Sequence, residues 1–154
     1  TSDRAREALF NVLQNEIFDS VFYDGFAGSG AVGLEALSRG AKKVVLTDVS
    51  SESVKLTKAN AALLKETPTI LNVDCVSFLS STDEKFDIIF LDPPYKKDDG
   101  ELALKIIAER DILLKEGVAV LEKDREGEKI SGLDKQKIKK YGKAFFTFYK
   151  KKNV

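Results

Sequence analysis

Two hydrophobic periodicities alternate along most of this chain. Short apolar runs typical of buried strands are followed by stretches in which apolar residues recur at helical spacing. The predicted strands are residues 21–24, 43–48, 69–73, 86–91 and 117–122. The predicted helices are one that begins at Thr1-Ser2-Asp3 and those at 31–39, 51–65 and 102–109, with a loop or short helix at 74–79. Because strands and helices alternate, they are expected to form a mostly parallel sheet.

The pattern changes near the end of the chain. Residues 135–141 and 144–149 alternate polar and apolar positions on either side of Gly142, which predicts an antiparallel hairpin. The predicted fold class is therefore α/β, with a mostly parallel sheet, helices on both faces and an antiparallel C-terminal hairpin. The length predicts a single domain over residues 1–154.

Composition narrows the possible chemistry. Histidine is absent, which excludes a Ser-His-Asp hydrolase and a histidine-ligated zinc enzyme within this chain. Cys75 is the only cysteine, so no disulfide can form within the chain and a reducing, cytoplasmic setting is favoured. No apolar stretch approaches the roughly 20 residues of a membrane span, and neither a membrane nor a metal partner is expected. Because methionine is also absent, Thr1 is not expected to be the native start, and a native N-terminal segment is expected to precede it.

Charge is unevenly distributed although the formal net charge is zero. Lysines crowd residues 134–154, with Asp134 as the only acid among them. They are Lys135, Lys137, Lys139, Lys140, Lys143, Lys150, Lys151 and Lys152. Two interpretations stay open: a nucleic-acid partner, or a solvated edge strand on which lysine discourages pairing with other chains.

The most informative motif is Asp92-Pro93-Pro94-Tyr95, directly after the predicted strand 86–91. Two prolines cannot continue a central strand, because each lacks a backbone donor. An acid, two rigid residues and an aromatic ring therefore project from the strand's carboxyl end, where open α/β sheets bind ligands. The Asp92 carboxylate and the Pro93 carbonyl can orient an exocyclic amine, and Tyr95 can stack on a base. The competing interpretation is an ordinary turn with a buried tyrosine.

A glycine-rich turn follows the first predicted strand. Gly28, Gly30 and Gly33 have the G-x-G-x-x-G spacing that lets backbone approach a nucleotide-type cofactor, and the next helix points its amide donors there. Asp48, at the end of the second strand, is placed to accept from ribose hydroxyls. The predicted cofactor-binding residues of these two segments are Asp24, Phe26, Ala27, Gly28, Ser29, Gly30, Asp48 and Val49. Tight turns also use glycine for steric reasons alone.

Asp24 separates two classes of cofactor. A carboxylate before the glycine turn would repel a pyrophosphate but would tolerate or favour an amino group and a sulfonium, which points to S-adenosylmethionine rather than NAD. Asp24 could instead cap the turn. Further along, Asp74 and Cys75 could face the adenine, although Asp74 also suits a helix N-cap.

These motifs resemble the class I S-adenosylmethionine-dependent amino-methyltransferases, and among them the RsmD-like 16S rRNA guanine-N(2) methyltransferases. The resemblance is carried by residues 1–11, 24–40, 86–95 and 141–142. It implies a Rossmann-like, seven-stranded sheet and cytoplasmic methylation of a guanine in small-subunit rRNA. It also implies an opening helix that partly covers the cofactor, so that Arg4 or Arg6 would meet the methionine carboxylate. The protein is expected to act as a monomer on 16S rRNA or the small ribosomal subunit.

Other functions stay open at this point. A DNA adenine-N(6) methyltransferase shares the Asp92 motif but usually carries a separate target-recognition region. A protein glutamine methyltransferase typically has asparagine at the position of Asp92. An NAD-dependent dehydrogenase would explain the glycines and leave the Asp92 motif unexplained. A non-catalytic RNA-binding module is the remaining alternative.

Overall fold

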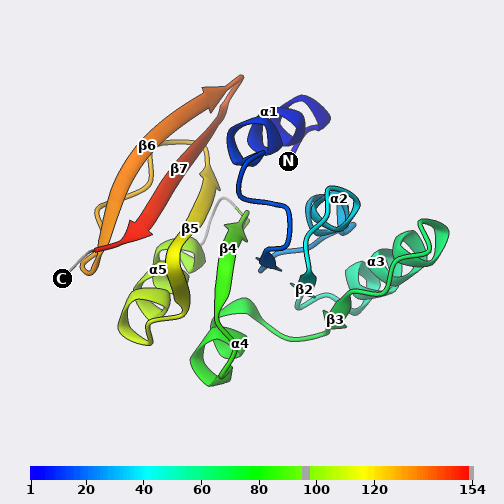
Figure 1. The fold of residues 1–154 in the computed structure, drawn as a ribbon. Helices are drawn as coiled ribbons and strands as arrows, with labels where there is room; N and C mark the ends of the chain where they lie inside the picture. Colours follow the sequence, from blue (N-terminus) through cyan, green and yellow to red (C-terminus); the bar gives the residue numbers. More distant parts are fainter. Residues whose placement is uncertain (95–97, 153–154) are drawn as a thin grey trace.

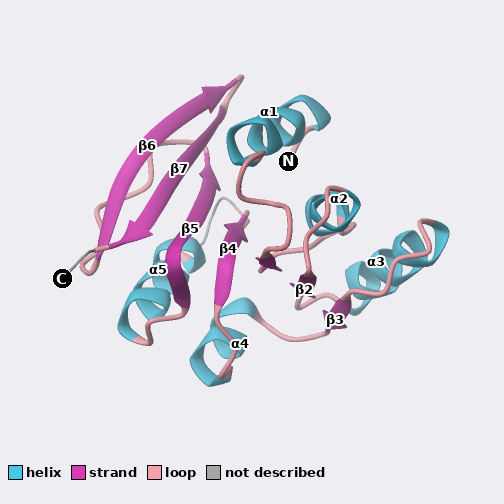
Figure 2. Ribbon diagram, viewed as in Figure 1, coloured by secondary structure: helices cyan, strands magenta, loops and turns pink. Residues whose placement is uncertain are grey.

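A computed structural model describes residues 1–94 and 98–152 (Figures 1 and 2). Within these ranges the helices are α1 Asp3–Leu13, α2 Ala31–Ser38, α3 Ser51–Leu63, α4 Cys75–Ser81 and α5 Asp99–Glu109. The strands are β1 Val21–Asp24, β2 Lys43–Thr47, β3 Thr69–Leu71, β4 Phe86–Leu91, β5 Leu113–Lys123, β6 Leu133–Tyr141 and β7 Ala144–Lys151. None of the described helices combines the length and the apolar character needed to cross a membrane.

The strands form a single sheet in the order β3-β2-β1-β4-β5-β7-β6. β1 to β5 run parallel to one another, whereas β7 pairs antiparallel with both β5 and β6. This confirms the predicted mostly parallel, seven-stranded sheet with an antiparallel C-terminal hairpin. Strand order reverses between β1 and β4, and such a switch point opens a crevice at the carboxyl ends of the strands.

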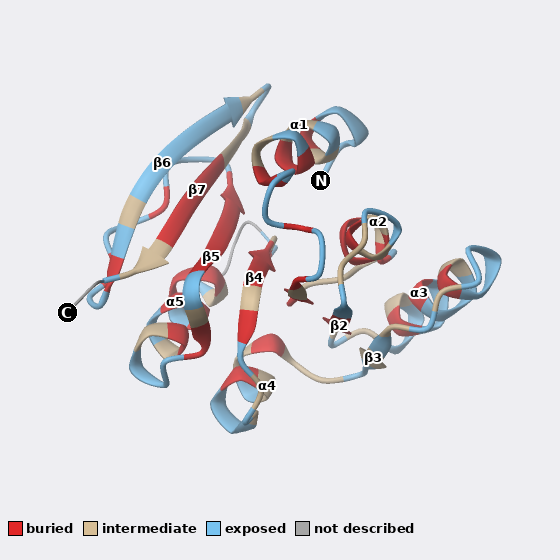
Figure 3. Ribbon diagram, viewed as in Figure 1, coloured by how far each residue is buried: buried red, intermediate tan, exposed pale blue. Residues whose placement is uncertain are grey.

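Helices cover both faces of the sheet, and apolar side chains fill the space between. On one face α1 and α2 contribute Leu9, Phe10, Val32 and Ala36. On the other, α4 and α5 contribute Leu79, Leu104 and Ile107. The central strands are mostly buried, whereas β6 at the sheet edge is largely exposed (Figure 3). The burial of β1 and β4 on both faces holds their carboxyl ends in fixed positions.

The fifth strand is longer than predicted. A strand beginning at Gly117 was expected, but Leu113 already pairs with Phe86 before the register shifts and Ile88 pairs with Val118. Glu116 has a φ of 65°, so irregular backbone absorbs the extra residues between the two paired parts. The predicted start was wrong because the charged residues before Gly117 interrupt the apolar pattern without interrupting backbone pairing.

Two other predicted boundaries also differ. α5 begins at Asp99 rather than 102, and Gly100 in its first turn packs so closely that a Cβ there would lie 2.5 Å from Leu121 Cδ1. β3 ends at Leu71 rather than 73, because an edge strand has only β2 to pair with. The remaining boundaries lie within two residues of those predicted.

Candidate functional site

A cavity of about 500 Å³ opens at the carboxyl ends of β1, β2 and β4. It brings together residues that are far apart in the sequence. Its lining comprises Thr1, Gly25, Phe26, Gly28, Asp48, Val49, Asp74, Cys75, Asp92, Pro93, Pro94 and Asp99. The structure thus places Asp92 and the glycine-rich turn in one cavity, within the size range of small-molecule sites. Tyr95, predicted to stack on a base, lies outside the described residues.

Backbone contacts fix the glycine-rich turn. The Gly25 N–H donates to Phe90 O at 3.0 Å and the Ala27 N–H to Thr47 O at 3.0 Å, which ties the turn to both neighbouring strands. A Cβ at Gly25 would lie 2.6 Å from Cys75 Sγ, so only glycine allows this approach to α4. Gly30 begins α2 with a φ of 85°, a conformation that glycine adopts without steric cost.

Asp48 organises the turn from the end of β2. Its Oδ2 accepts from the Gly28 N–H at 2.9 Å and its Oδ1 from the Ser50 N–H at 2.9 Å. A carboxylate oxygen can accept a second hydrogen bond. Asp48 can therefore hold the turn and still accept from a hydroxyl in the cavity, so its predicted ribose contact stays a prediction that this geometry allows.

Asp24 is a buried carboxylate with an unsatisfied atom. The residue is 1% exposed, and its Oδ1 has no hydrogen-bond partner in the described part of the chain. Burial, followed by the negative charge of Asp92, raises the pKa of Asp24 to about 7. Asp24 is not among the residues that line the cavity, although the next residue, Gly25, is. An unpaired buried acceptor is costly, and a cationic donor at that wall of the cavity would relieve the cost.

Asp74 and Cys75 also line the cavity. Asp74 is the N-cap of α4, because its Oδ2 accepts from the Ser77 N–H at 3.1 Å, and it also lines the cavity. The two interpretations of Asp74 are therefore compatible. Cys75 is buried, and burial raises the pKa of its thiol to about 12, so it is not a reactive nucleophile.

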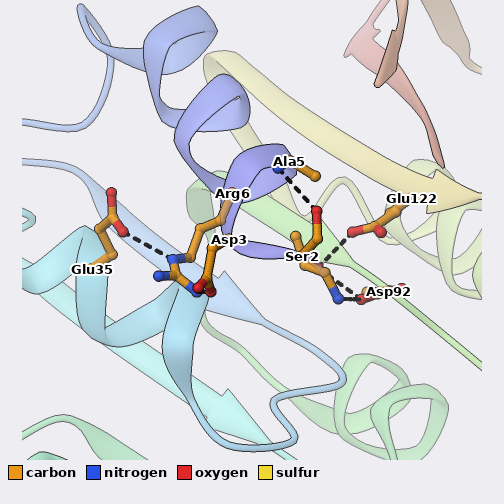
Figure 4. A network of polar contacts seen from close by, with 8 residues as sticks. Ser2, Asp3, Ala5, Arg6, Glu35, Asp92 and Glu122 are labelled. Carbon is orange, nitrogen blue, oxygen red and sulfur yellow. Dashed lines mark hydrogen bonds and ion pairs between the residues drawn. The ribbon is translucent and has the colours of Figure 1, made fainter. Parts of the chain in front are cut away.

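The two predicted arginines lie elsewhere. Arg6 lines a second cavity, of about 690 Å³ and bounded by α1, α2 and α3, together with the predicted Ser29. Its Nε donates to Glu35 Oε1 at 3.0 Å, as Figure 4 shows. Arg4 is exposed and lines neither cavity. Their contact with a cofactor carboxylate stays a prediction, and for Arg6 it would require the Glu35 pair to separate.

Two residues that contact or adjoin Asp92, namely Glu122 and Thr1, were not predicted as site residues. Glu122, near the end of β5, lies beside Asp92 because Leu91 and Leu121 are register partners. The Thr1 hydroxyl lies 2.8 Å from Asp92 Oδ2 and 2.5 Å from Glu122 Oε1. One signal was available: like Asp92, Glu122 is an acid at the end of an apolar run. Its significance depended on knowing that β4 and β5 are neighbours.

Comparisons with known proteins agree with this arrangement. The family model described as Conserved hypothetical protein 95 matches residues 1–150. Ribosomal RNA small subunit methyltransferase D of Haemophilus influenzae is 36% identical over 131 residues, which cover 82% of this chain and 68% of that protein. The protein of the same name from Escherichia coli (strain K12) is 36% identical over 127 residues, which cover 82% and 64%.

The chain thus spans about two thirds of the length of these curated relatives. Among solved structures, YhhF from Escherichia coli superposes with a TM-score of 0.90 at 30% identity, covering 99% of this chain and 87% of the other. A family match over nearly the whole chain, together with this superposition, shows the family. The chain belongs to the RsmD-like methyltransferase family, described as Conserved hypothetical protein 95.

Proposed function

We propose that this protein transfers a methyl group from S-adenosylmethionine to the exocyclic 2-amino group of a guanine in 16S rRNA, in the cytoplasm. The observation that carries the proposal is the placement of Asp92 and Pro93 in one cavity with the glycine-rich turn. Family membership supports the reaction class. The names of the two relatives, both small-subunit rRNA methyltransferases, support the substrate.

The residues around the cavity fit S-adenosylmethionine. Asp24 offers an unpartnered, buried oxygen to a cationic group, and the Asp48 carboxylate offers acceptors to a ribose. When bound, this cofactor supplies a methyl group on a sulfonium, whose carbon–sulfur bond breaks with its electron pair kept by sulfur. A pyrophosphate-bearing cofactor fits less well, because the ionised forms of Asp24, Asp48 and Asp92 would all repel it.

Asp92 has one oxygen available for the substrate. Both contacts from Thr1 reach Oδ2, and no described residue hydrogen-bonds Oδ1. In the proposed reaction Oδ1 accepts an N–H of the guanine amine and turns the nitrogen lone pair toward the methyl carbon. The lone pair forms the new nitrogen–carbon bond, and the amine proton passes to Oδ1 and then to solvent. Orientation is the main catalytic device here, since the chain has no histidine for proton transfer.

The lysine-rich hairpin ends on the same side of the sheet as this cavity. Lys139 pairs with Phe146, and Phe146 pairs with Glu122, which lies beside Asp92. Three strand spacings of about 4.8 Å separate Asp92 from β6, about 14 Å in all. That distance is within reach of phosphates flanking a target nucleotide.

The lysines at this end are also free of acidic partners. In the described part of the chain Lys137, Lys139, Lys140 and Lys143 are exposed and form no ion pair, whereas Lys135 pairs with Glu126 and Lys151 with Asp111. Lys140 lies over the Phe145 ring, 5.2 Å from its centroid. Unpaired lysines beside aromatic rings are typical of surfaces that bind RNA.

Charge reversal on this hairpin is expected to weaken RNA binding. The double variant Lys139→Glu/Lys140→Glu should lower affinity for 16S rRNA by at least about tenfold. It should also reduce the salt dependence of binding, since each lost phosphate contact lowers the magnitude of the slope of log K against log salt concentration by about 0.7. Affinity for S-adenosylhomocysteine should not change. Filter binding at several salt concentrations measures the affinity for RNA, and calorimetry measures the affinity for S-adenosylhomocysteine.

The matched control is Lys115→Glu/Lys152→Glu, two exposed lysines at the opposite end of the strands. Equal weakening in both double variants would contradict a specific RNA surface.

The function itself is tested with small ribosomal subunits that lack the methyl groups. Labelled S-adenosylmethionine should transfer its label to 16S rRNA, and nucleoside analysis should identify N(2)-methylguanosine. Label in N(6)-methyladenosine would favour the adenine-specific alternative instead. Calorimetry with S-adenosylhomocysteine and with NADH separates the cofactor classes without needing the RNA.

A further inference from the structure

Glu122 is a buried acid that the reaction described above does not use. It is 4% exposed and belongs to β5, the strand next to the one that carries Asp92. Residues 91 and 121 face each other in this parallel pair, so Asp92 and Glu122 are neighbours that point to the same face of the sheet. That face is the one covered by α1.

The Thr1 hydroxyl joins the two carboxyl groups. Its Oγ1 lies 2.8 Å from Asp92 Oδ2 and 2.5 Å from Glu122 Oε1, and the Thr1 backbone nitrogen donates to the same Oδ2 at 3.1 Å. In Figure 4 these contacts connect the start of α1 with Asp92 and Glu122. Both contacts to Asp92 reach Oδ2, and no described residue hydrogen-bonds its Oδ1.

The number of protons limits which of these groups can be ionised together. A hydroxyl donates only one hydrogen bond, so Thr1 Oγ1 cannot donate to two ionised carboxylates at once. Both contacts are satisfied when one carboxyl group is protonated and donates to Thr1 Oγ1, which in turn donates to the other carboxylate. If Glu122 carries the proton, Thr1 Oγ1 donates to Asp92 Oδ2. The chain of donors then ends on an ionised Asp92.

The surroundings of Glu122 favour its protonated form. Burial, followed by the negative charge of Asp92, raises the pKa of Glu122 above its ordinary value. The groups that face it are Asp92 on β4, the hydroxyl and the positively charged amino group of Thr1 before α1, and the apolar Phe146 on β7. The Thr1 hydrogen bond and the charge of its amino group act in the opposite direction and lower this pKa, but the net shift is upward. Two lysines lie near Glu122 in the sheet, but neither forms an ion pair with it. Lys139 lies one strand beyond Phe146, and Lys123 pairs with Glu101 of α5 on the other face.

We propose that Glu122 is a positioning residue for Asp92. Protonated Glu122 and the Thr1 hydroxyl form a directional hydrogen-bond chain that holds Asp92 by Oδ2 and keeps Oδ1 free for the substrate amine. This role rests on the proposed methyl transfer, because the orientation of Oδ1 matters only if Oδ1 meets an amine. The hydrogen-bond chain itself exists without cofactor or RNA.

Three substitutions test the role in the transfer reaction. Glu122→Leu and Thr1→Val each remove one link and should lower kcat at least about tenfold, with the KM for RNA and the Kd for S-adenosylhomocysteine within about twofold of wild type. Thr1→Ser keeps the hydroxyl and should stay within about threefold of the wild-type kcat. A wild-type kcat in Thr1→Val would overturn the proposal. A loss of kcat in Thr1→Ser as large as that in Thr1→Val would also overturn it.

A measurement without turnover separates this role from the proposed function. Carbon-13 NMR of the glutamate carboxyl groups in the cofactor-free protein should show Glu122 titrating above the ordinary range. Asp92→Asn should lower that pKa, because it removes the neighbouring charge. A Glu122 that titrates in the ordinary range would overturn the donor order. If wild-type protein methylates no RNA while Glu122 titrates high, the proposed function fails and the hydrogen-bond chain stands.

Discussion

Replacing Asp92 by alanine is expected to lower kcat by at least about a thousandfold, within the range that orientation and general-base catalysis together supply. The guanine amine is a poor nucleophile, since its lone pair is delocalised into the ring. Without Asp92 Oδ1 nothing directs that lone pair toward the methyl carbon, and the departing proton loses its acceptor. Single-turnover transfer from labelled S-adenosylmethionine to small ribosomal subunits measures the effect.

Cofactor binding should survive this substitution. Asp92 lines the cavity, but the glycine-rich turn and Asp48 are held by contacts that do not include it. The Kd for S-adenosylhomocysteine is therefore expected to change less than about threefold, since a partly exposed charge contributes little to binding. Asp98→Ala is a suitable control, because Asp98 is an exposed acid that follows the same loop and makes no side-chain cap. Parallel loss of binding and transfer in Asp92→Ala would contradict the catalytic role.

Replacing Asp24 by asparagine is expected to stabilise the folded protein while it destroys cofactor binding. Asp24 has an ordinary pKa of 3.8 and a folded-state pKa of about 7, because burial disfavours its ionised form. Its protonated form therefore contributes stability that is fully present below 3.8 and is lost as the pH rises through 7. Ionisation above that point costs on the order of 4 kcal/mol, at about 1.4 kcal/mol for each pH unit.

Asparagine avoids this cost because it cannot ionise. At pH 8 the free energy of unfolding of Asp24→Asn should exceed that of wild type by a few kcal/mol, and the difference should vanish near pH 4. Urea unfolding at both pH values measures it. Asp83→Asn, an exposed acid without an ion pair in the described part of the chain, is the control. Equal stabilities of wild type and Asp24→Asn at pH 8 would show that Asp24 ionises without cost.

The same substitution should weaken S-adenosylhomocysteine binding at least about a hundredfold at pH 8, since it replaces a buried charge–charge contact by an amide. In wild type the affinity should fall as the pH drops below about 7, where Asp24 takes up a proton and loses its attraction for a cation. Calorimetric titrations between pH 6 and 8 measure this dependence. A pH-independent Kd would place the cationic group of the ligand away from Asp24.

The elements, the fold class and most of the residues that line the cavity can be derived from residue patterns alone. Regular alternation of apolar runs and helical periodicities requires a mostly parallel sheet, and parallel strands put all their carboxyl ends on one side. Asp24, Asp48 and Asp92 each follow or end such a run, so their convergence could be derived before any coordinates. Local chemistry was also readable: Ser2, Ser50 and Asp74 cap helices as their types suggest.

Contacts between side chains that are far apart in the sequence follow from packing instead. Glu122 and Asp92 become neighbours through the pairing of β4 with β5, and Thr1 reaches both from the other end of the chain. Arg6 pairs with Glu35 because α1 packs beside α2, a contact that no local pattern contains. The pKa of Asp24 likewise depends on burial and on the charge of Asp92, both products of packing. Periodicity specifies the face and the end of an element, whereas partners across the sequence depend on strand order and register, which local residue patterns do not encode.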